Sequence, residues 1–140
     1  MDINELFQKK LAEGCSLGHA QWIYARHHLD GDGAPKDLDI AEEWFDLAWR
    51  NRFPGTANTQ RFLLQRKWPR FVNSACDSQP RLRDILLGAD LSASEEVAHI
   101  TLHPHNDAQA AWLGKHVEEI ADSFRAFGDN PFSDINITIQ

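Results

Sequence analysis

Hydrophobic residues recur along most of the chain at intervals of three and four positions, which is the spacing of one face of an α-helix. Gly, Pro, Asp and Asn residues, which favour helix ends and turns, interrupt this pattern repeatedly. The pattern therefore predicts a series of helices joined by short turns. Seven helices are expected, over approximately 3–13, 17–29, 38–52, 56–68, 80–87, 93–103 and 106–127.

Several of these helices have recognisable end signals. Asp37 is a suitable N-cap for the third helix, and Pro69 is expected to end the fourth. Ser92 and Glu95 have the spacing of a capping box, and Pro104 would end the short sixth helix that they begin. Residues 129–140 fit either a short extended segment or a tail.

The amino-acid composition favours the same fold class. The chain has 140 residues, the size of one domain, with sixteen Ala and only three Val. Ala favours helix, whereas β-branched residues favour strands. We therefore expect one all-α domain over residues 1–140, a compact bundle of about seven helices built from antiparallel helical hairpins.

The number of cysteines and the length of the apolar runs indicate the cellular location of the protein. Cys15 and Cys76 are too few for a disulfide scaffold and lack the spacing of metal ligands. The first residues do not form a signal peptide, and no apolar run approaches the roughly 18 residues that a membrane span needs. The sequence thus predicts a cytoplasmic protein with reduced thiols and no membrane partner.

Residues 18–49 combine helix, turn and cap signals in a repeat-like order. The matching positions are Ala20, Gln21, Gly31, Gly33, Pro35, Lys36, Asp37, Ala41, Trp44, Phe45 and Ala48. This segment resembles a Sel-one-like repeat, a relative of the tetratricopeptide repeats. A partial second copy begins at Gly55, so the repeat-like part covers about 18–64. One repeat cannot bury its own faces, and helices within about 79–128 are expected to cap it.

This resemblance implies a non-catalytic protein–protein interaction module that needs no cofactor. Small bacterial proteins of this kind are similar to adaptors and to immunity proteins that neutralise toxins. The implied partner is another protein, such as a toxin or a secretion-system component. The resemblance does not imply an enzyme.

Charge is distributed unevenly along the chain, although the net charge is −7. Residues 1–49 carry 4 basic and 10 acidic side chains, residues 50–83 carry 8 and 1, and residues 84–140 carry 2 and 10. The basic middle segment either pairs with the acidic flanks, faces an acidic protein, or binds nucleic acid. Because the net charge is negative, nucleic acid is the less expected partner.

Charged and aromatic side chains supply the candidate contacts with a partner. The candidate residues are Asp39, Glu43, Trp22, Trp49, Arg61 and Trp68. The two acids could steer a basic partner, and a tryptophan or arginine could anchor one. The alternatives are an ordinary solvated helix face for the charges and core packing for each tryptophan.

Three histidines offer the alternative of a metal-dependent enzyme. His99, His103 and His105 lie close in sequence, and the first two would share one helical face with Glu96 nearby. The chain contains no His-Glu-x-x-His motif, and Pro104 separates the last two histidines. A surface or helix-cap role is the competing interpretation, and we predict no metal site.

Overall fold

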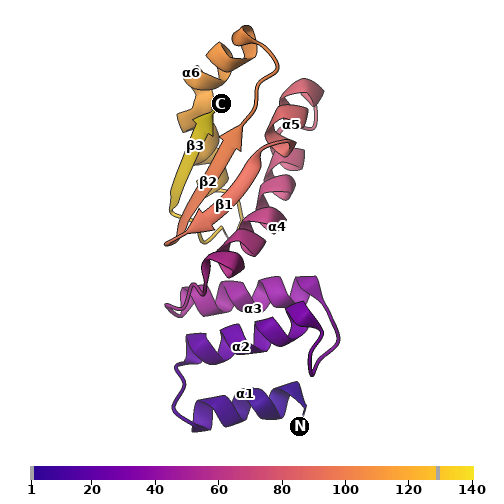
Figure 1. Cartoon of the computed structure of the whole chain (residues 1–140), viewed down its shortest axis with the longest axis vertical. Helices are drawn as coiled ribbons and strands as arrows, with labels where there is room; N and C mark the ends of the chain where they lie inside the picture. Colours follow the sequence, from indigo (N-terminus) through magenta and orange to yellow (C-terminus); the bar gives the residue numbers. More distant parts are fainter. Residues whose placement is uncertain (1, 129) are drawn as a thin grey trace. The chain divides into compact units, whose positions relative to one another are not determined.

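The computed structural model describes residues 2–128 and 130–140, which form six helices and one three-stranded sheet (Figure 1). The elements, in chain order, are α1 (Ile3–Ala12), α2 (Leu17–Asp30), α3 (Leu38–Arg50), α4 (Ala57–Ala75), α5 (Pro80–Leu87), β1 (Asp90–Ser94), β2 (Val97–Leu102), α6 (Asp107–Arg125) and β3 (Asp134–Ile139). The prediction of an all-α bundle of about seven helices is therefore wrong. The chain divides into two compact units, Met1–Thr59 and Gln60–Gln140, which are described separately.

The first unit contains α1, α2 and α3, and local signals set the ends of its helices. Gly31 ends α2 in the left-handed conformation, with a φ of 68° that glycine adopts without strain. One carboxylate oxygen of Asp37 accepts hydrogen bonds from the backbone N–H groups of Asp39 and Ile40, each at 3.0 Å. These caps lie where the sequence predicts them, because a cap depends on only a few neighbouring residues.

Small residues allow α2 and α3 to lie close together. Ala25, Ala41 and Ala48 are fully buried, and Phe45 is 1% exposed. A Cβ atom at Gly18 would lie 2.6 Å from the backbone oxygen of Asn51, which is closer than real contacts allow. The start of α2 can therefore approach the end of α3 only because residue 18 has no side chain.

The second unit has an aromatic core between α4 and α6. Trp68 is 1% exposed, its ring centroid lies 5.1 Å from that of Phe124, and its indole N–H donates to the backbone oxygen of Leu86 at 2.7 Å. Phe71 lies 5.3 Å from Phe124 in the same cluster. These contacts explain why α4 continues through Pro69 to Ala75, although the proline is expected to end it.

The prediction of a helix over 93–103 is wrong, because this segment forms β1 and β2. The two strands pair antiparallel through a turn at Glu95 and Glu96, whose φ angles are 54° and 68°. Such a turn usually contains Asn and Gly, so the sequence carries no hairpin signal here. The apparent capping box of Ser92 and Glu95 is part of this hairpin.

The third strand joins the sheet through a crossover. β3 pairs parallel with β2, giving the strand order β1–β2–β3, and α6 makes the connection between them. The strand lies within residues 129–140, for which the sequence leaves two alternatives, a short extended segment or a tail. Residue 129, which belongs to the same stretch, lies outside the described residues.

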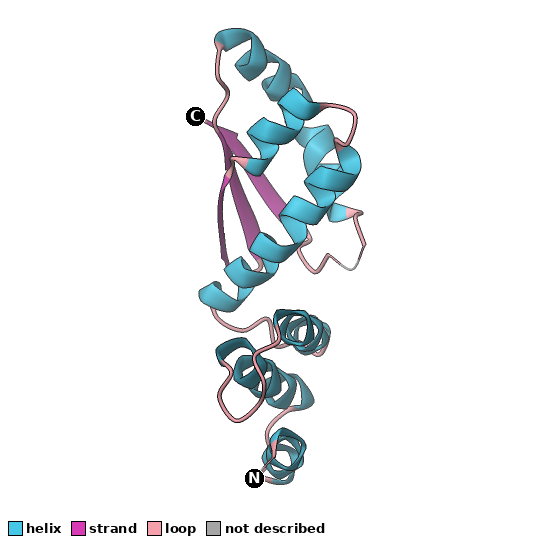
Figure 2. Ribbon diagram, turned by 90° about the vertical axis from the view of Figure 1, so that its right-hand side faces the viewer, coloured by secondary structure: helices cyan, strands magenta, loops and turns pink. Residues whose placement is uncertain are grey.

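The sheet has one apolar and one polar face. Ala98, Ile100 and Leu102 of β2 are fully buried, whereas the alternate residues of this strand are only half-buried. Figure 2 shows the helices of this unit on one side of the sheet. Ser92, His99 and Asn136 form one row across the other face, in neighbouring register positions.

Candidate functional site

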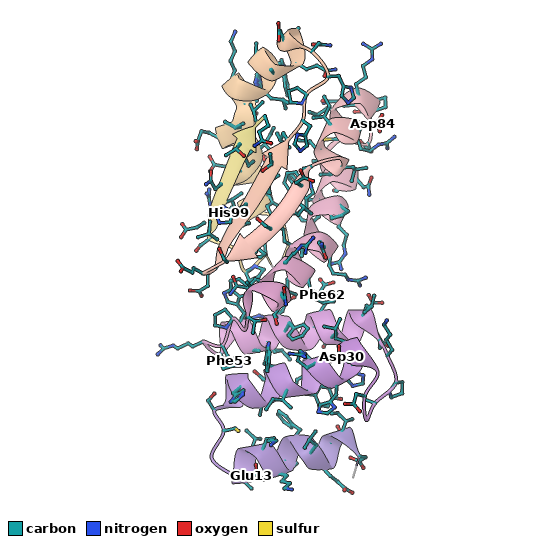
Figure 3. The ribbon with its side chains drawn as sticks, in the orientation of Figure 1. Glu13, Asp30, Phe53, Phe62, Asp84 and His99 are labelled. Atoms are coloured by element: carbon teal, nitrogen blue, oxygen red, sulfur yellow. The ribbon has the colours of Figure 1, made fainter. Side chains whose placement is uncertain are left out.

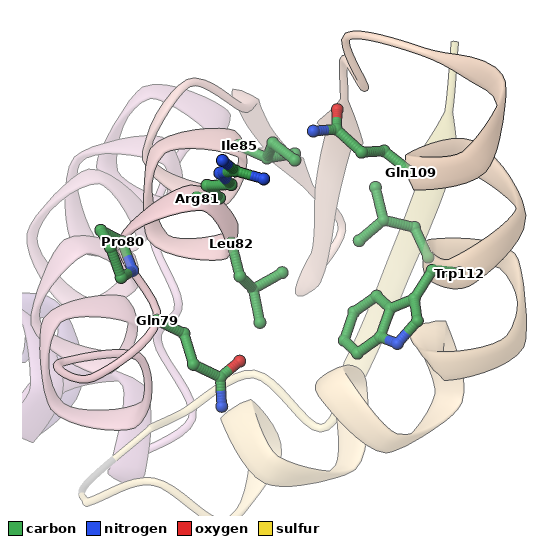
Figure 4. A pocket seen from close by; sticks show the side chains of 8 residues that line it. Gln79, Pro80, Arg81, Leu82, Ile85, Gln109 and Trp112 are labelled. Atoms are coloured by element: carbon green, nitrogen blue, oxygen red, sulfur yellow. The ribbon is translucent and has the colours of Figure 1, made fainter.

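An open cleft lies between α5 and α6 in the second unit. Its volume is about 570 Å³, and its walls are mostly apolar. Leu82 and Gln79 extend from one side, and Trp112 and Gln109 from the other (Figure 4). Ile85 and Leu113 line it as well, and both are almost completely buried.

A second cleft of about 300 Å³ shares Gln79, Leu82 and Trp112 with the first. It continues along α6 and reaches the end of α4. The lining residues on α6 are Gln109, Trp112, Leu113, His116, Glu119, Ile120 and Ser123. We call the two clefts together the α6 groove. Gln109 and Ser123 are 14 positions apart, so the groove follows α6 for about 21 Å.

Trp112 is the most distinctive side chain of the α6 groove. It is 44% exposed, which is unusual for so large an apolar group. Its indole stacks on the ring of His116, with centroids 4.0 Å apart and planes 17° apart. The histidine thus supports the indole from within α6, one helical turn away, while nearly half of the tryptophan surface remains accessible.

Two charges of opposite sign line the α6 groove. Arg81 lines the first cleft and Glu119 the second, and both residues are exposed. Neither side chain forms an ion pair within the described part of the chain, residues 2–128 and 130–140. Both charges are therefore available to a molecule in the groove.

A thiol lies in the wall of the second cleft. Cys76 is 4% exposed, and burial raises the pKa of its thiol above the ordinary value. The nearby Arg83 lowers this pKa and Asp77 raises it, but both effects are smaller than that of burial. The thiol is therefore neutral near pH 7, and it contributes apolar surface rather than a nucleophile.

Comparison with protein-family models, curated proteins and solved structures gives no match. The α6 groove is therefore interpreted from its own geometry and chemistry. No helix among the described residues is both long enough and apolar enough to cross a membrane.

The tryptophans that the sequence proposes as anchors lie elsewhere. Trp68 is buried in the core of the second unit and has no surface to offer a partner. Trp22 and Trp49 are half-buried in the first unit. The indole of Trp22 donates to Thr59 Oγ1 at 3.0 Å and lies 5.2 Å from the guanidinium of Arg26, so its contacts are intramolecular.

The charged candidates are accessible. Asp39 and Glu43 are exposed on α3, and Arg61 is exposed on α4. On the same helix Lys67 is only 7% exposed, so it cannot belong to an exposed basic surface for nucleic acid. Arg66, Lys67 and Arg70 all take part in interactions within the chain.

The sequence predicts His99 and His103 on one face of a helix, but the structure has no helix there. His99 lies on β2 (Figure 3), and His103 and His105 follow that strand. Four strand residues span about 13 Å, so His99 and His103 are much farther apart than on a helix. No group of three or more His, Cys, Asp or Glu side chains that could hold a metal ion occurs among the described residues.

His103 has a different partner. Its Nε2 atom lies 2.7 Å from Oδ2 of Asp90, at the start of β1. Both side chains are well exposed, at 43% and 81%. This pair is a surface contact across the β1–β2 hairpin and does not line the α6 groove.

The sequence does not single out Leu82 or Trp112, which line opposite sides of the α6 groove. Leu82 shares an apolar face of α5 with Ile85 and Leu86, and Trp112 directly precedes Leu113, where the apolar stripe of α6 begins. One signal was present: Trp112, His116 and Ile120 follow each other every four residues and form a second row beside that stripe. A helix with an apolar face this wide has more surface than one packing partner covers.

Proposed function

We propose that the protein is a non-catalytic protein–protein interaction module that binds a segment of its partner in the α6 groove. The half-exposed Trp112 beside an open apolar cleft carries this proposal. Tryptophan is enriched among the residues that dominate binding energy at protein interfaces. Such a residue in a concave apolar site is the usual mark of a binding surface.

The extent of the α6 groove supports a polypeptide partner. A cleft of about 570 Å³ alone falls within the range of small-molecule sites. Here, however, it continues into a second cleft and follows α6 for about 21 Å. Residues from the ends of both clefts can therefore contact one elongated segment.

The resemblance of residues 18–64 to Sel-one-like repeats supports the same class of function, since that family consists largely of interaction scaffolds. An adaptor or a toxin-neutralising immunity protein is the concrete role that we propose. The partner would then be a toxin or a secretion-system component. This role uses binding alone and needs no catalytic group.

The test is recovery of a partner with matched variants of the full chain. Trp112→Ala removes the proposed anchor, whereas Leu87→Ala removes a 41% exposed leucine of α5 that does not line the groove. A partner purified from the native host with the wild-type protein is then titrated by calorimetry. We expect the Trp112 variant to bind at least about 30-fold more weakly, as for a 2 kcal/mol anchor.

The Leu87 variant should bind the partner as the wild type does. Circular dichroism checks that both variants are folded. Equal affinity of the Trp112 variant and the wild type would show that the partner binds elsewhere. Failure to recover any protein partner would also count against the proposal.

A further inference from the structure

We infer that the segment bound in the α6 groove is an amphipathic helix of about 14 residues, with an acidic residue near one end and a basic residue near the other. This inference rests on the proposed function and adds the chemistry of the partner segment. Three properties of the groove lead to it: its walls, its length and its charges.

The walls favour a helical occupant. They come from α4, α5 and α6, whose backbone N–H and C=O groups are mostly bonded within each helix. An extended peptide gains backbone hydrogen bonds from a binding site at a sheet edge, and helical walls do not supply one. A helix satisfies its backbone internally, so only its side chains need to fit the apolar surface.

The length and spacing fit the same occupant. A groove of about 21 Å accommodates about 14 helical residues at a rise of 1.5 Å each. On α6 the side chains at Gln109, Trp112, His116, Glu119 and Ser123 recur every three or four positions. A second helix that packs along this row would present its own apolar residues at the same spacing.

The charges define the ends of the occupant. Arg81 lines the first cleft together with Gln109. Glu119 lies ten positions after Gln109 on α6, which is about 15 Å from Gln109 along the helix. A helix with an acidic residue near Arg81 and a basic residue near Glu119 would satisfy both charges. A helix with the same charge at both ends would meet repulsion at one of them.

Three amphipathic probe peptides of about 14 residues test this inference. All have capped termini and leucines at every third and fourth position, and they differ only at their two ends. The first carries one Glu and one Lys, the second two Glu, and the third two Lys. Fluorescence anisotropy measures their affinity for the full-length protein, with Leu82→Ala as a check that binding uses the groove.

The wild-type protein should bind the Glu/Lys peptide about fivefold more tightly than either like-charged peptide. Glu119→Lys should shift the preference to the Glu/Glu peptide, and Arg81→Glu should shift it to the Lys/Lys peptide. Glu118→Lys and Lys115→Glu are the matched controls, because both residues are exposed on α6 and neither lines the groove. These two variants should keep the wild-type preference.

The outcomes separate the two proposals. Equal binding of all three peptides, lost in Leu82→Ala, would overturn the charge assignment but leave a binding groove. Absence of binding by every peptide, or binding that Leu82→Ala leaves unchanged, would overturn the helical occupant. If sedimentation shows a dimer that Leu82→Ala dissociates, a second copy of the chain is the occupant and the inference is wrong.

Discussion

Trp44 of the first unit and Trp112 of the second unit differ in what they contact. In the first unit Phe7, Tyr24 and Trp44 pack on one another. The ring centroid of Trp44 lies 5.5 Å from that of Phe7 and 4.2 Å from that of Tyr24. In the second unit Trp112 contacts His116 of its own helix and is otherwise turned to the α6 groove. Tryptophan content alone therefore says little about a binding site, because the same residue type holds helices together at one position and remains accessible at another.

The same contrast distinguishes aromatic residues that stabilise the fold from those that bind a partner. An aromatic ring with several ring partners stabilises the fold, so its removal should appear in unfolding experiments. A ring exposed on one face gains most of its contacts only when a partner arrives. Substituting tryptophans of each kind should thus divide their effects between the two measurements.

The largest effect is expected for Trp68→Ala in the core of the second unit. The side chain is 1% exposed and donates a hydrogen bond to the Leu86 oxygen, so its loss leaves a cavity and an unpaired buried acceptor. We expect the free energy of unfolding to fall by about 3–5 kcal/mol. Urea denaturation followed by circular dichroism measures this, and a loss below about 1 kcal/mol would contradict the assigned core.

A smaller loss is expected for Trp44→Ala in the first unit. This ring contacts Phe7 and Tyr24 but is only half-buried. Since partial burial leaves less apolar area to lose, we expect a decrease of about 2 kcal/mol. The same urea titration applies, and an unchanged midpoint would show that the aromatic cluster does not stabilise α1–α3.

Substitutions in the β1–β2 turn should increase the stability of the protein instead of lowering it. Glu95 and Glu96 both have positive φ angles, which are strained for residues other than Gly and Asn. Replacing them together by Asn and Gly should stabilise the protein by about 1–2 kcal/mol. Thermal unfolding would show a higher Tm, whereas a lower Tm would argue that the glutamate side chains make essential contacts.

Trp112→Ala should have little effect on stability. The ring is 44% exposed and stacks only on a histidine one turn away, so we expect a loss below about 1 kcal/mol. Partner binding should weaken strongly in the same variant. A loss of stability as large as that of Trp68→Ala would mean that Trp112 belongs to the core and not to a binding surface.

The smallest effect on stability is expected from the ionisation of Cys76, whose thiol lies in the wall of the groove. Because burial raises the pKa of Cys76, its folded thiol stays neutral at pH values where the unfolded thiol ionises. Its contribution to stability is complete below the unfolded pKa and is lost as the pH rises through the folded pKa. Alkylation followed by mass spectrometry should therefore modify the half-buried Cys15 faster than Cys76 at pH 8. Equal rates would contradict a buried, neutral Cys76.

Local signals predict several helix ends correctly, although Pro69 does not end α4 and the spacing of Ser92 and Glu95 does not begin a helix. The caps at Asp37 and Asn106 and the glycine at the end of α2 each depend on a few neighbouring residues, and they set the helix ends in the structure. The hairpin of β1 and β2 has a turn without the usual residues, and β3 depends on pairing with a distant segment. β3 joins β2 across more than thirty residues, and no periodicity within either segment reveals that pairing.

The candidate site was harder to predict for the same reason. Leu82 and Trp112 are thirty positions apart, and only the packing of the second unit places them on opposite sides of one cleft. Trp68 is a candidate anchor from the sequence, because the sequence alone does not show whether a tryptophan is buried or exposed. Exposure depends on what the sheet and the other helices cover.

The most direct test of the α6 groove is a nuclear magnetic resonance titration of the ¹⁵N-labelled protein with the Glu/Lys probe peptide. We expect the largest shifts at the indole N–H of Trp112 and at the backbone amides of Leu82 and His116. Amides on the polar face of the sheet, such as that of Asn136, should stay unchanged. Shifts centred on the sheet or on α1–α3, with the Trp112 indole unmoved, would show that the peptide does not bind in the α6 groove.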